Sequence, residues 1–314
     1  MLGRLCNSLG VSGYEKNTTN IILQALDEVS NNTSYVDKVG NVVYKKEGTV
    51  GNQRIMICAH IDEVGFQVVR KINERKYRIK ALGNIKTWNA FQQRVVSHNS
   101  IGIINAFDES NLKAHNFENL FIEVISDSIV NVGDVFTFDS SFYESKKYYI
   151  GKALDNRLAC EILLDEIKAN TTSKDDIYFV FTIQEEIGMR GIRYAKSLIK
   201  PDICIIIDTS PESDMSSLVI GKGVGIKISD SVFVSSPDLV DWMRKISDKN
   251  NILYQMEVSD CGTNELIISN EHDSGYKELG ISIPCQYPHA ANTVVAKNDI
   301  QECKKLLSRI IAGL

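Results

Sequence analysis

Histidine and acidic side chains follow apolar runs at several points of this 314-residue chain. Apolar runs of this kind are typical of buried strands, and a strand end holds a side chain in a fixed position. Two histidines and several carboxylates suit one or two divalent cations such as zinc, cobalt or manganese. The candidates are His60 in ICAHIDEVGF, Asp155 in GKALDNR (the one motif without an apolar run before it), Glu185 and Glu186 in VFTIQEEIGMRG, Asp208 in ICIIIDTS, and His289 in IPCQYPHAA.

The first of these motifs places an acid two residues after a histidine. The run Arg54–His60 alternates in the manner of a strand and ends at His60, and Asp62 follows. In an extended segment residues i and i+2 share a face, so Asp62 is placed to accept the imidazole N–H, fix its tautomer and raise its basicity as a ligand. The alternative is a buried histidine whose N–H is simply satisfied by a neighbouring acid.

The acidic pair gives a stronger signal. Glu185 and Glu186 follow an apolar strand and precede Gly188. Adjacent side chains on a strand diverge, so one carboxylate can ligate a metal while the other serves as general base toward a water molecule. The alternative is an acidic start of the next helix, stabilised by the helix dipole.

The other candidates are weaker when each is taken alone. Asp208 could cap a loop, Asp155 could be a helix-start acid, and His289 could be a loop histidine. The remaining histidines stand in polar surroundings and are interpreted as surface residues: His98, His115 and His272.

Composition limits the class of protein. Hydrophobic residues make up 43% and charged residues 24%, and the formal net charge is -5. No Lys/Arg-rich run occurs, which argues against a nucleic-acid partner, and no apolar run is long enough for a transmembrane helix. The seven cysteines form no CxxC, and the N-terminus lacks the apolar core of a signal peptide. A reducing, cytoplasmic location is therefore expected.

The chain divides into three regions. A helix over roughly Tyr14–Val29 and strands around Tyr35–Lys45 and Arg54–His60 come first. From 66 to 150 short β runs follow one another, the last being Tyr148–Ile150, with no helical period between them, which predicts an inserted all-β module resembling a small barrel.

Helices and apolar strands alternate over 151–314. Helices are expected over Leu154–Lys168 and Arg190–Ile199, and buried strands over Ile177–Ile183 and Ile203–Ile207. Long apolar strands between helices favour a sheet that is covered on both faces. Ser236 and Pro237 should begin a further helix, and Asn298 with Gln301 should begin the last one in a capping box.

Taken together, the motifs resemble the M42 family of metallo-aminopeptidases. The resemblance rests on AHIDEVGF, GKALDNR, TIQEEIGMRG, DTS and the late YPHA, and it extends through QRVV and NVGDVFTFD in the β region. It implies an α/β fold, a three-layer α/β/α metallopeptidase domain (1–65 and 151–314) with an inserted small β-barrel-like domain (66–150) that serves oligomerisation and access.

The resemblance also implies roles for the candidate residues. One metal is expected at His60 and Asp208, the other at Glu186 and His289, with Asp155 bridging both. Glu185 is expected to be the general base, and Asp62 the support of His60. The expected protein binds two divalent metal ions per subunit, zinc first and then cobalt or manganese. It removes N-terminal residues from short peptides and forms a homo-oligomer, up to a dodecamer.

Two positions depart from the family pattern. Asn264 stands where the family commonly has aspartate, and Gln286 where it commonly has arginine. They keep two alternatives open: a related metal-dependent deacylase or amidase, and a catalytically impaired scaffold or binding protein. A glycosidase is disfavoured, because two acids flanking a sugar need no histidines.

Overall fold

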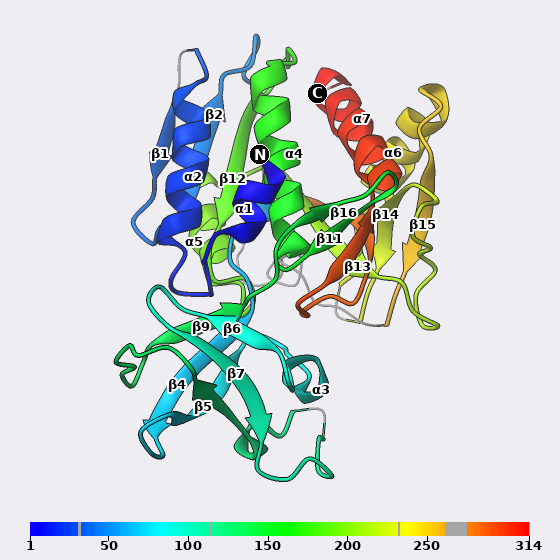
Figure 1. Cartoon of the computed structure of the whole chain (residues 1–314). Helices are drawn as coiled ribbons and strands as arrows, with labels where there is room; N and C mark the ends of the chain where they lie inside the picture. Colours follow the sequence, from blue (N-terminus) through cyan, green and yellow to red (C-terminus); the bar gives the residue numbers. More distant parts are fainter. Residues whose placement is uncertain (31–32, 114, 232, 261–274, 314) are drawn as a thin grey trace.

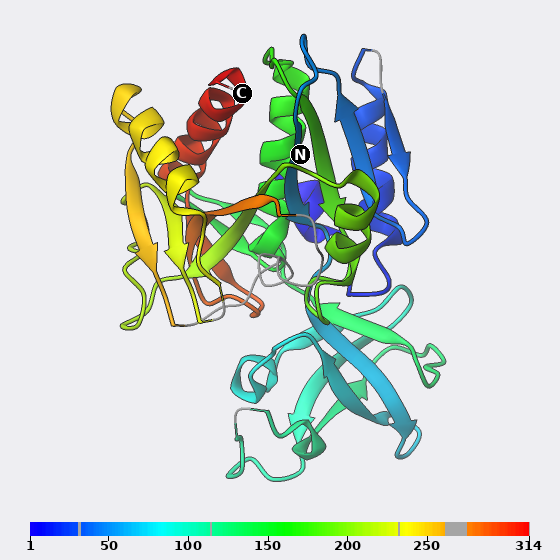
Figure 2. The ribbon, with the colours of Figure 1, turned by 180° about the vertical axis from the view of Figure 1, so that it is seen from behind.

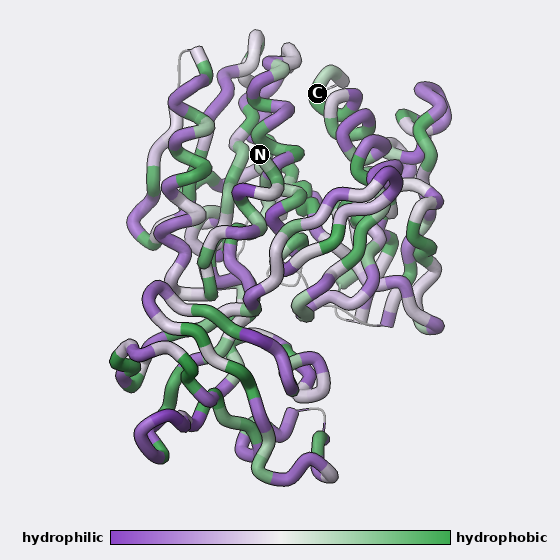
Figure 3. The backbone as a smooth tube through the Cα atoms, in the orientation of Figure 1, coloured by the Kyte–Doolittle hydropathy of each residue, from purple (hydrophilic) through white to green (hydrophobic). Residues whose placement is uncertain are grey.

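The computed structural model describes residues 1–30, 33–113, 115–231, 233–260 and 275–313. Two parts are evident in Figure 1: a large sheet flanked by helices, which contains both termini, and a small barrel below it. Hydrophobic stretches run through the strands and helices, whereas the lower end of the barrel is largely hydrophilic (Figure 3). Among the described residues, no helix is both long and apolar enough to cross a membrane.

The large sheet is mixed and, among the described residues, contains 11 strands. Its main path runs β1-β2-β12-β3-β13-β16-β17-β11-β10, and β14 joins β16 and β15 beside it. Four central strands, β12, β3, β13 and β16, pair in parallel, so their carboxyl ends meet at one edge. The strands are β1 Ser34–Val36, β2 Val42–Lys46, β3 Arg54–His60, β10 Tyr143–Glu144, β11 Tyr148–Gly151, β12 Asp176–Thr182, β13 Ile203–Pro211, β14 Val224–Ser229, β15 Tyr254–Val258, β16 Lys277–Gln286 and β17 Thr293–Ala296.

Helices cover both faces of this sheet, which confirms the predicted three layers. The helices whose side chains join the larger core are α1 Leu2–Asn7, α2 Lys16–Asp27, α4 Leu154–Ala169, α6 Pro237–Lys249 and α7 Lys297–Gly313. Helix α5, Arg190–Ile199, covers the opposite face, which Figure 2 shows from behind. Strand β3 is continuously apolar because Ile55 and Ile57 enter the first core while Met56 and Cys58 enter the second.

Two helix starts differ from the sequence prediction in their capping. Helix α6 begins at Pro237 as predicted, but the Ser236 hydroxyl accepts a hydrogen bond from the Glu278 N–H of β16 instead of capping the helix. Helix α7 begins at Lys297, one residue before Asn298, so the predicted capping box is wrong. In the first case a strand N–H competes successfully for the serine oxygen.

In the part of the chain that the structure describes, six antiparallel strands close the barrel in the order β4-β5-β8-β7-β6-β9. Its interior is a separate core that includes Phe66, Phe136 and Phe138. It also contains the short helix α3, Thr87–Ala90, and the 3-10 turn η1, Phe117–Asn119, so the prediction of an all-β insert is wrong in detail. The strands are β4 Gly65–Lys71, β5 Lys76–Leu82, β6 Arg94–Val96, β7 Ile101–Ala106, β8 Leu120–Val124 and β9 Val135–Phe138.

The strand Tyr148–Ile150 lies outside the barrel, which corrects its assignment to the insert. Strand β11 pairs with β17 and β10, at the edge of the large sheet. The apolar period of the sequence identifies a strand but not the strand that pairs with it. Here the pairing strand β17 lies about 145 residues further along the chain.

A buried ion network lies where the barrel leaves the large sheet. Glu63 accepts hydrogen bonds from Lys152 at 2.7 Å, from Arg157 at 3.1 Å and from the Thr137 hydroxyl of β9 at 2.7 Å. Its carboxylate also accepts the Gly10 N–H at 3.0 Å. The network therefore joins the barrel, the start of α4 and the N-terminal segment through one carboxylate.

Replacing Glu63 with glutamine should lower the free energy of unfolding by about 3–5 kcal/mol, because two buried cations would lose their carboxylate partner. Urea unfolding measures this difference. The control is Glu74→Gln, whose carboxylate is 94% exposed beside Lys71. An unfolding curve for Glu63→Gln that coincides with that of Glu74→Gln would contradict the prediction.

Candidate metal centre

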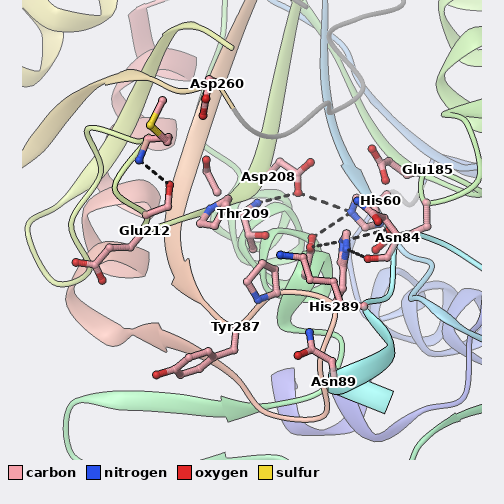
Figure 4. A pocket seen from close by; sticks show the side chains of 18 of the residues that line it. His60, Asn84, Asn89, Glu185, Asp208, Thr209, Glu212, Asp260, Tyr287 and His289 are labelled. Carbon is pink, nitrogen blue, oxygen red and sulfur yellow. Dashed lines mark hydrogen bonds and ion pairs between the residues drawn. The ribbon is translucent and has the colours of Figure 1, made fainter. Parts of the chain in front are cut away.

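The candidate side chains converge at the carboxyl edge of the parallel strands (Figure 4). His60 is the last residue of β3, and Glu185 and Glu186 follow β12. His289 lies in the turn between β16 and β17, and Asp155 at the start of α4. Asp208 was expected at a strand end, but β13 continues to Pro211 because its pairing with β16 continues past it.

Asp155 lies between the two histidines. Its Oδ1 is 3.3 Å from His60 Nε2, and its Oδ2 is 3.4 Å from His289 Nε2. On the outer sides, Asp208 Oδ1 is 3.7 Å from His60 Nε2, and Glu186 Oε2 is 3.3 Å from His289 Nε2. The arrangement is two trios of donor atoms that share one carboxylate.

This donor set fits two divalent cations. Ligand atoms of His60, Asp155 and Asp208 lie within 4.8 Å of one another, and so do those of Asp155, Glu186 and His289. Three carboxylates so close together repel one another unless positive charge lies between them. Imidazole nitrogens and carboxylate oxygens together are typical ligands of zinc and similar ions. The residues present therefore fit a pair of such ions that share Asp155.

The imidazoles are held by second partners on their Nδ1 side. His60 Nδ1 lies 3.2 Å from the Asp62 carbonyl oxygen and 3.5 Å from its carboxylate. His289 Nδ1 lies 2.9 Å from the carbonyl oxygen of Asn84, which comes from the barrel. Each carbonyl oxygen accepts a hydrogen bond from a proton on Nδ1 and leaves Nε2 directed at the centre. A proton on Nδ1 and none on Nε2 is the tautomer that a metal ligand needs. Sequence reasoning missed Asn84, because a backbone carbonyl leaves no signal in the residue type.

Asp62 does more than support His60. Its carboxylate accepts the backbone N–H of Glu185 at 3.0 Å and of Glu186 at 3.2 Å. It also accepts the Ser12 hydroxyl at 2.5 Å. Burial alone would raise the pKa of Asp62, but the His60 imidazole and these hydrogen bonds outweigh burial and hold it below its usual value. The buried carboxylate therefore stays ionised and fixes the turn that carries both glutamates.

Glu185 is the buried carboxyl group beside this centre. Only 7% of its surface is exposed. Burial raises the pKa of Glu185 well above its usual value. The charge of His60 lowers this pKa, whereas the charges of Glu186 and Asp208 raise it further. A carboxyl group in such surroundings takes up a proton more readily than one in water, which suits a general base.

Asp155 is positioned by irregular backbone at the start of α4. Asp155 and Asn156 have non-helical φ/ψ, so the regular helix begins only at Arg157. The Asn156 side chain donates a hydrogen bond to the Ile207 carbonyl oxygen of β13 at 2.8 Å. This bond ties the start of α4 to the strand that carries Asp208.

The turn that carries the glutamates also contacts the N-terminal segment. Glu15 accepts the N–H of Gln184 at 3.2 Å and that of Gly13 at 2.7 Å. Burial, and then the charge of Asp62, raises the pKa of Glu15 from 4.5 to about 7. Glu15 therefore stabilises the fold most when it is protonated.

The sign of the resulting pH dependence follows. Folded Glu15 binds its proton more tightly than unfolded Glu15, so its contribution to stability is full below pH about 4.5 and is lost as the pH rises through about 7. Glu15→Gln cannot ionise. Relative to the natural chain, it should gain unfolding free energy between pH 5 and pH 8, by up to about 3 kcal/mol. Urea unfolding at the two pH values, at equal metal content, tests this; an equal difference at both would contradict it.

A cavity of about 810 Å³ opens onto the centre. Its walls come from the large sheet, from the turn after β16 and from the barrel. Gln286, one of the two departures from the family pattern, donates a hydrogen bond to Glu212 of this wall at 2.8 Å. Asn264, the other departure, and the surface assignment of His272 lie outside the described residues. His98 and His115 are exposed.

Comparison with known proteins agrees with the fold. The M42 glutamyl aminopeptidase family profile matches residues 40–306. A relative from Acetivibrio thermocellus, assigned as an aminopeptidase by its name, is 31% identical over 326 residues, which cover 99% of this chain and 97% of the relative.

Solved structures are similar over the whole chain. The aminopeptidase APDkam598 from the archaeon Desulfurococcus kamchatkensis has a TM-score of 0.91 at 26% identity, covering 100% of this chain and 94% of that chain. The TET1 peptidase of Pyrococcus horikoshii, described as able to assemble into a tetrahedron or a large octahedral shell, has a TM-score of 0.89 at 25% identity and covers 100% of this chain and 98% of that chain.

Proposed function

The chain belongs to the M42 glutamyl aminopeptidase family, and from this premise we propose that it removes N-terminal residues from short peptides at a centre of two divalent cations. The observation that carries the proposal is Asp155, whose two oxygens each face a different imidazole at 3.3 and 3.4 Å. His60 and Asp208 would hold one of the two cations, and Glu186 and His289 would hold the other.

The chemistry assigned to this chain is hydrolysis of the first peptide bond. Two bound divalent cations would polarise the scissile carbonyl and make a water molecule more acidic. Glu185 accepts the proton of that water as its oxygen attacks the carbonyl carbon. It then delivers the proton to the leaving amine, so that one water is consumed and an amino acid and a shortened peptide are released. Asp62 holds Glu185 and Glu186 in place through their N–H groups.

Three finer points belong to the same proposal. Zinc is the first choice of metal and cobalt or manganese the next, because the donor set mixes imidazole and carboxylate. The protein acts as a homo-oligomer, up to a dodecamer, with support from the shells described for the TET1 peptidase. It works in the cytoplasm, with support from the described cysteines, which are all buried.

The test is an assay of metal-loaded protein on a panel of aminoacyl chromogenic amides and short peptides. Release of N-terminal residues from at least some of them is expected. Absence of release from all of them, with two equivalents of metal bound per chain, would overturn the proposal.

A related deacylase or amidase would use the same centre, because any amide carbonyl could be attacked there. Matched peptides with a free or an acetylated N-terminus separate the two functions. Cleavage of the acetylated peptide alone would favour the deacylase.

A further inference from the structure

The turn between β5 and α3 brings the barrel into contact with the candidate metal centre. Its Asn84 carbonyl oxygen lies 2.9 Å from Nδ1 of His289. Gly83 has φ +88, and a Cβ added there would lie 2.6 Å from Val64 and 3.3 Å from the Glu186 carboxylate. Only glycine suits this close approach and this backbone conformation. This wall of the cavity is therefore held at a fixed distance from two of the candidate ligands.

The barrel adds a distinct set of side chains to the cavity wall: Asn84, Lys86, Trp88 and Asn89. Trp88 is 50% exposed although it is the largest side chain type, and the Lys86 ammonium lies 5.5 Å from its ring. None of the four is a carboxylate. This part of the wall offers amides, an aromatic face and a positive charge.

The charge on the far side of the cavity is opposite. Glu212 and Asp260 line it there, beyond Asp208 and Thr209, whereas Asn84 and Asn89 lie toward His289 (Figure 4). Lys227 also lines the cavity, but it is neutralised by buried Glu257 at 2.9 Å. Among the described lining residues outside the metal centre, the net charge therefore changes from negative at the large sheet to positive at the barrel.

A short peptide carries the complementary charges, with an ammonium group at its first residue and a carboxylate at its last. We propose that the barrel wall of Lys86 and Trp88 is the subsite for the leaving part of the peptide, with Lys86 facing its C-terminal carboxylate and Trp88 contacting the residue after the scissile bond. This inference rests on the proposed peptidase function. It gives the barrel a role in selecting short peptides with a free carboxyl end.

The test compares substrates that share the same first residue. They are an aminoacyl amide whose leaving group is ammonia, a tripeptide with a free C-terminus, and the same tripeptide as its C-terminal amide. Lys86→Met should abolish a three- to fivefold preference for the free acid over the tripeptide amide, the effect of about 1 kcal/mol from one exposed ion pair. Trp88→Ala should raise KM about fivefold for both tripeptides, with kcat and the aminoacyl amide little affected.

Two variants of the same barrel serve as matched controls. Phe107→Ala removes another aromatic ring that is 50% exposed, and Lys80→Met removes another exposed lysine, which lies on β5. Neither lines the cavity. Equal effects from control and test variants, or unchanged tripeptide kinetics in both test variants of an active enzyme, would overturn the inference. A natural chain that cleaves none of the three substrates would instead overturn the proposed function, and this inference with it.

Discussion

Glu185→Gln should reduce kcat by about a thousandfold on every substrate that the natural chain cleaves. Glutamine has nearly the same shape as glutamate but cannot take up a proton, and general-base catalysis contributes about 10²–10⁴ in rate. The Glu185 N–H that donates to Asp62 is a backbone group, so the turn should keep its conformation. The loss should therefore lie in kcat, with little change in KM.

Metal content and thermal stability distinguish a lost base from a damaged site. Metal analysis should find the same stoichiometry in Glu185→Gln as in the natural chain. Glu166→Gln is a matched control, since Glu166 is also a 7% exposed glutamate but lies on α4 and does not line the cavity. Full activity in Glu185→Gln would show that another group takes the proton, and a fall in bound metal would instead indicate that Glu185 is a ligand.

The residue types at the centre could be predicted because their meaning is local. A histidine or carboxylate that follows an apolar run, such as His60, signals both a strand end and a ligand. Parallel strands then bring their carboxyl ends together without further information. Asp155 shows where local reasoning stops: its oxygens face both histidines only because irregular backbone and Asn156 hold it against β13.

Contacts made by backbone groups, and contacts between the barrel and the large sheet, could not be predicted from the sequence. The carbonyl group of Asn84 positions His289, and nothing in the residue type reports it. The strand around Tyr148 has the same period as the barrel strands, yet it pairs with β17. Trp88 stands in a short helix that the sequence did not reveal, and its importance lies in the cavity that it lines. In each case the residue contacts, or lines a cavity with, parts of the chain that are distant in sequence.

Removal of metal by a chelator should abolish activity and lower the melting temperature. Ions that bind only the folded chain stabilise it by about 2.7 kcal/mol when their free concentration is a hundred times Kd. For a chain of this size that corresponds to a fall of roughly 4 °C for each ion removed. The structural reason is the closely spaced carboxylates of Asp155, Asp208 and Glu186, which repel one another when no cation lies between them. Restored zinc, cobalt or manganese should return both properties, and the ion that returns most activity identifies the preferred metal.

The carboxylate of Asp155, which faces both histidines, allows the binding of two ions to be tested at a single residue. Asp155→Asn replaces one of the two facing oxygens by an amide nitrogen that cannot ligate, so bound metal should fall below two ions per chain and activity by at least a hundredfold. Asp241→Asn, on the exposed surface of α6, should change neither. Two tightly bound ions in Asp155→Asn, with the chelator-induced fall in melting temperature unchanged, would mean that the histidines do not share this carboxylate through metal. The sharing of Asp155 between the two ions would then have to be abandoned, even if the chain proved to be an aminopeptidase.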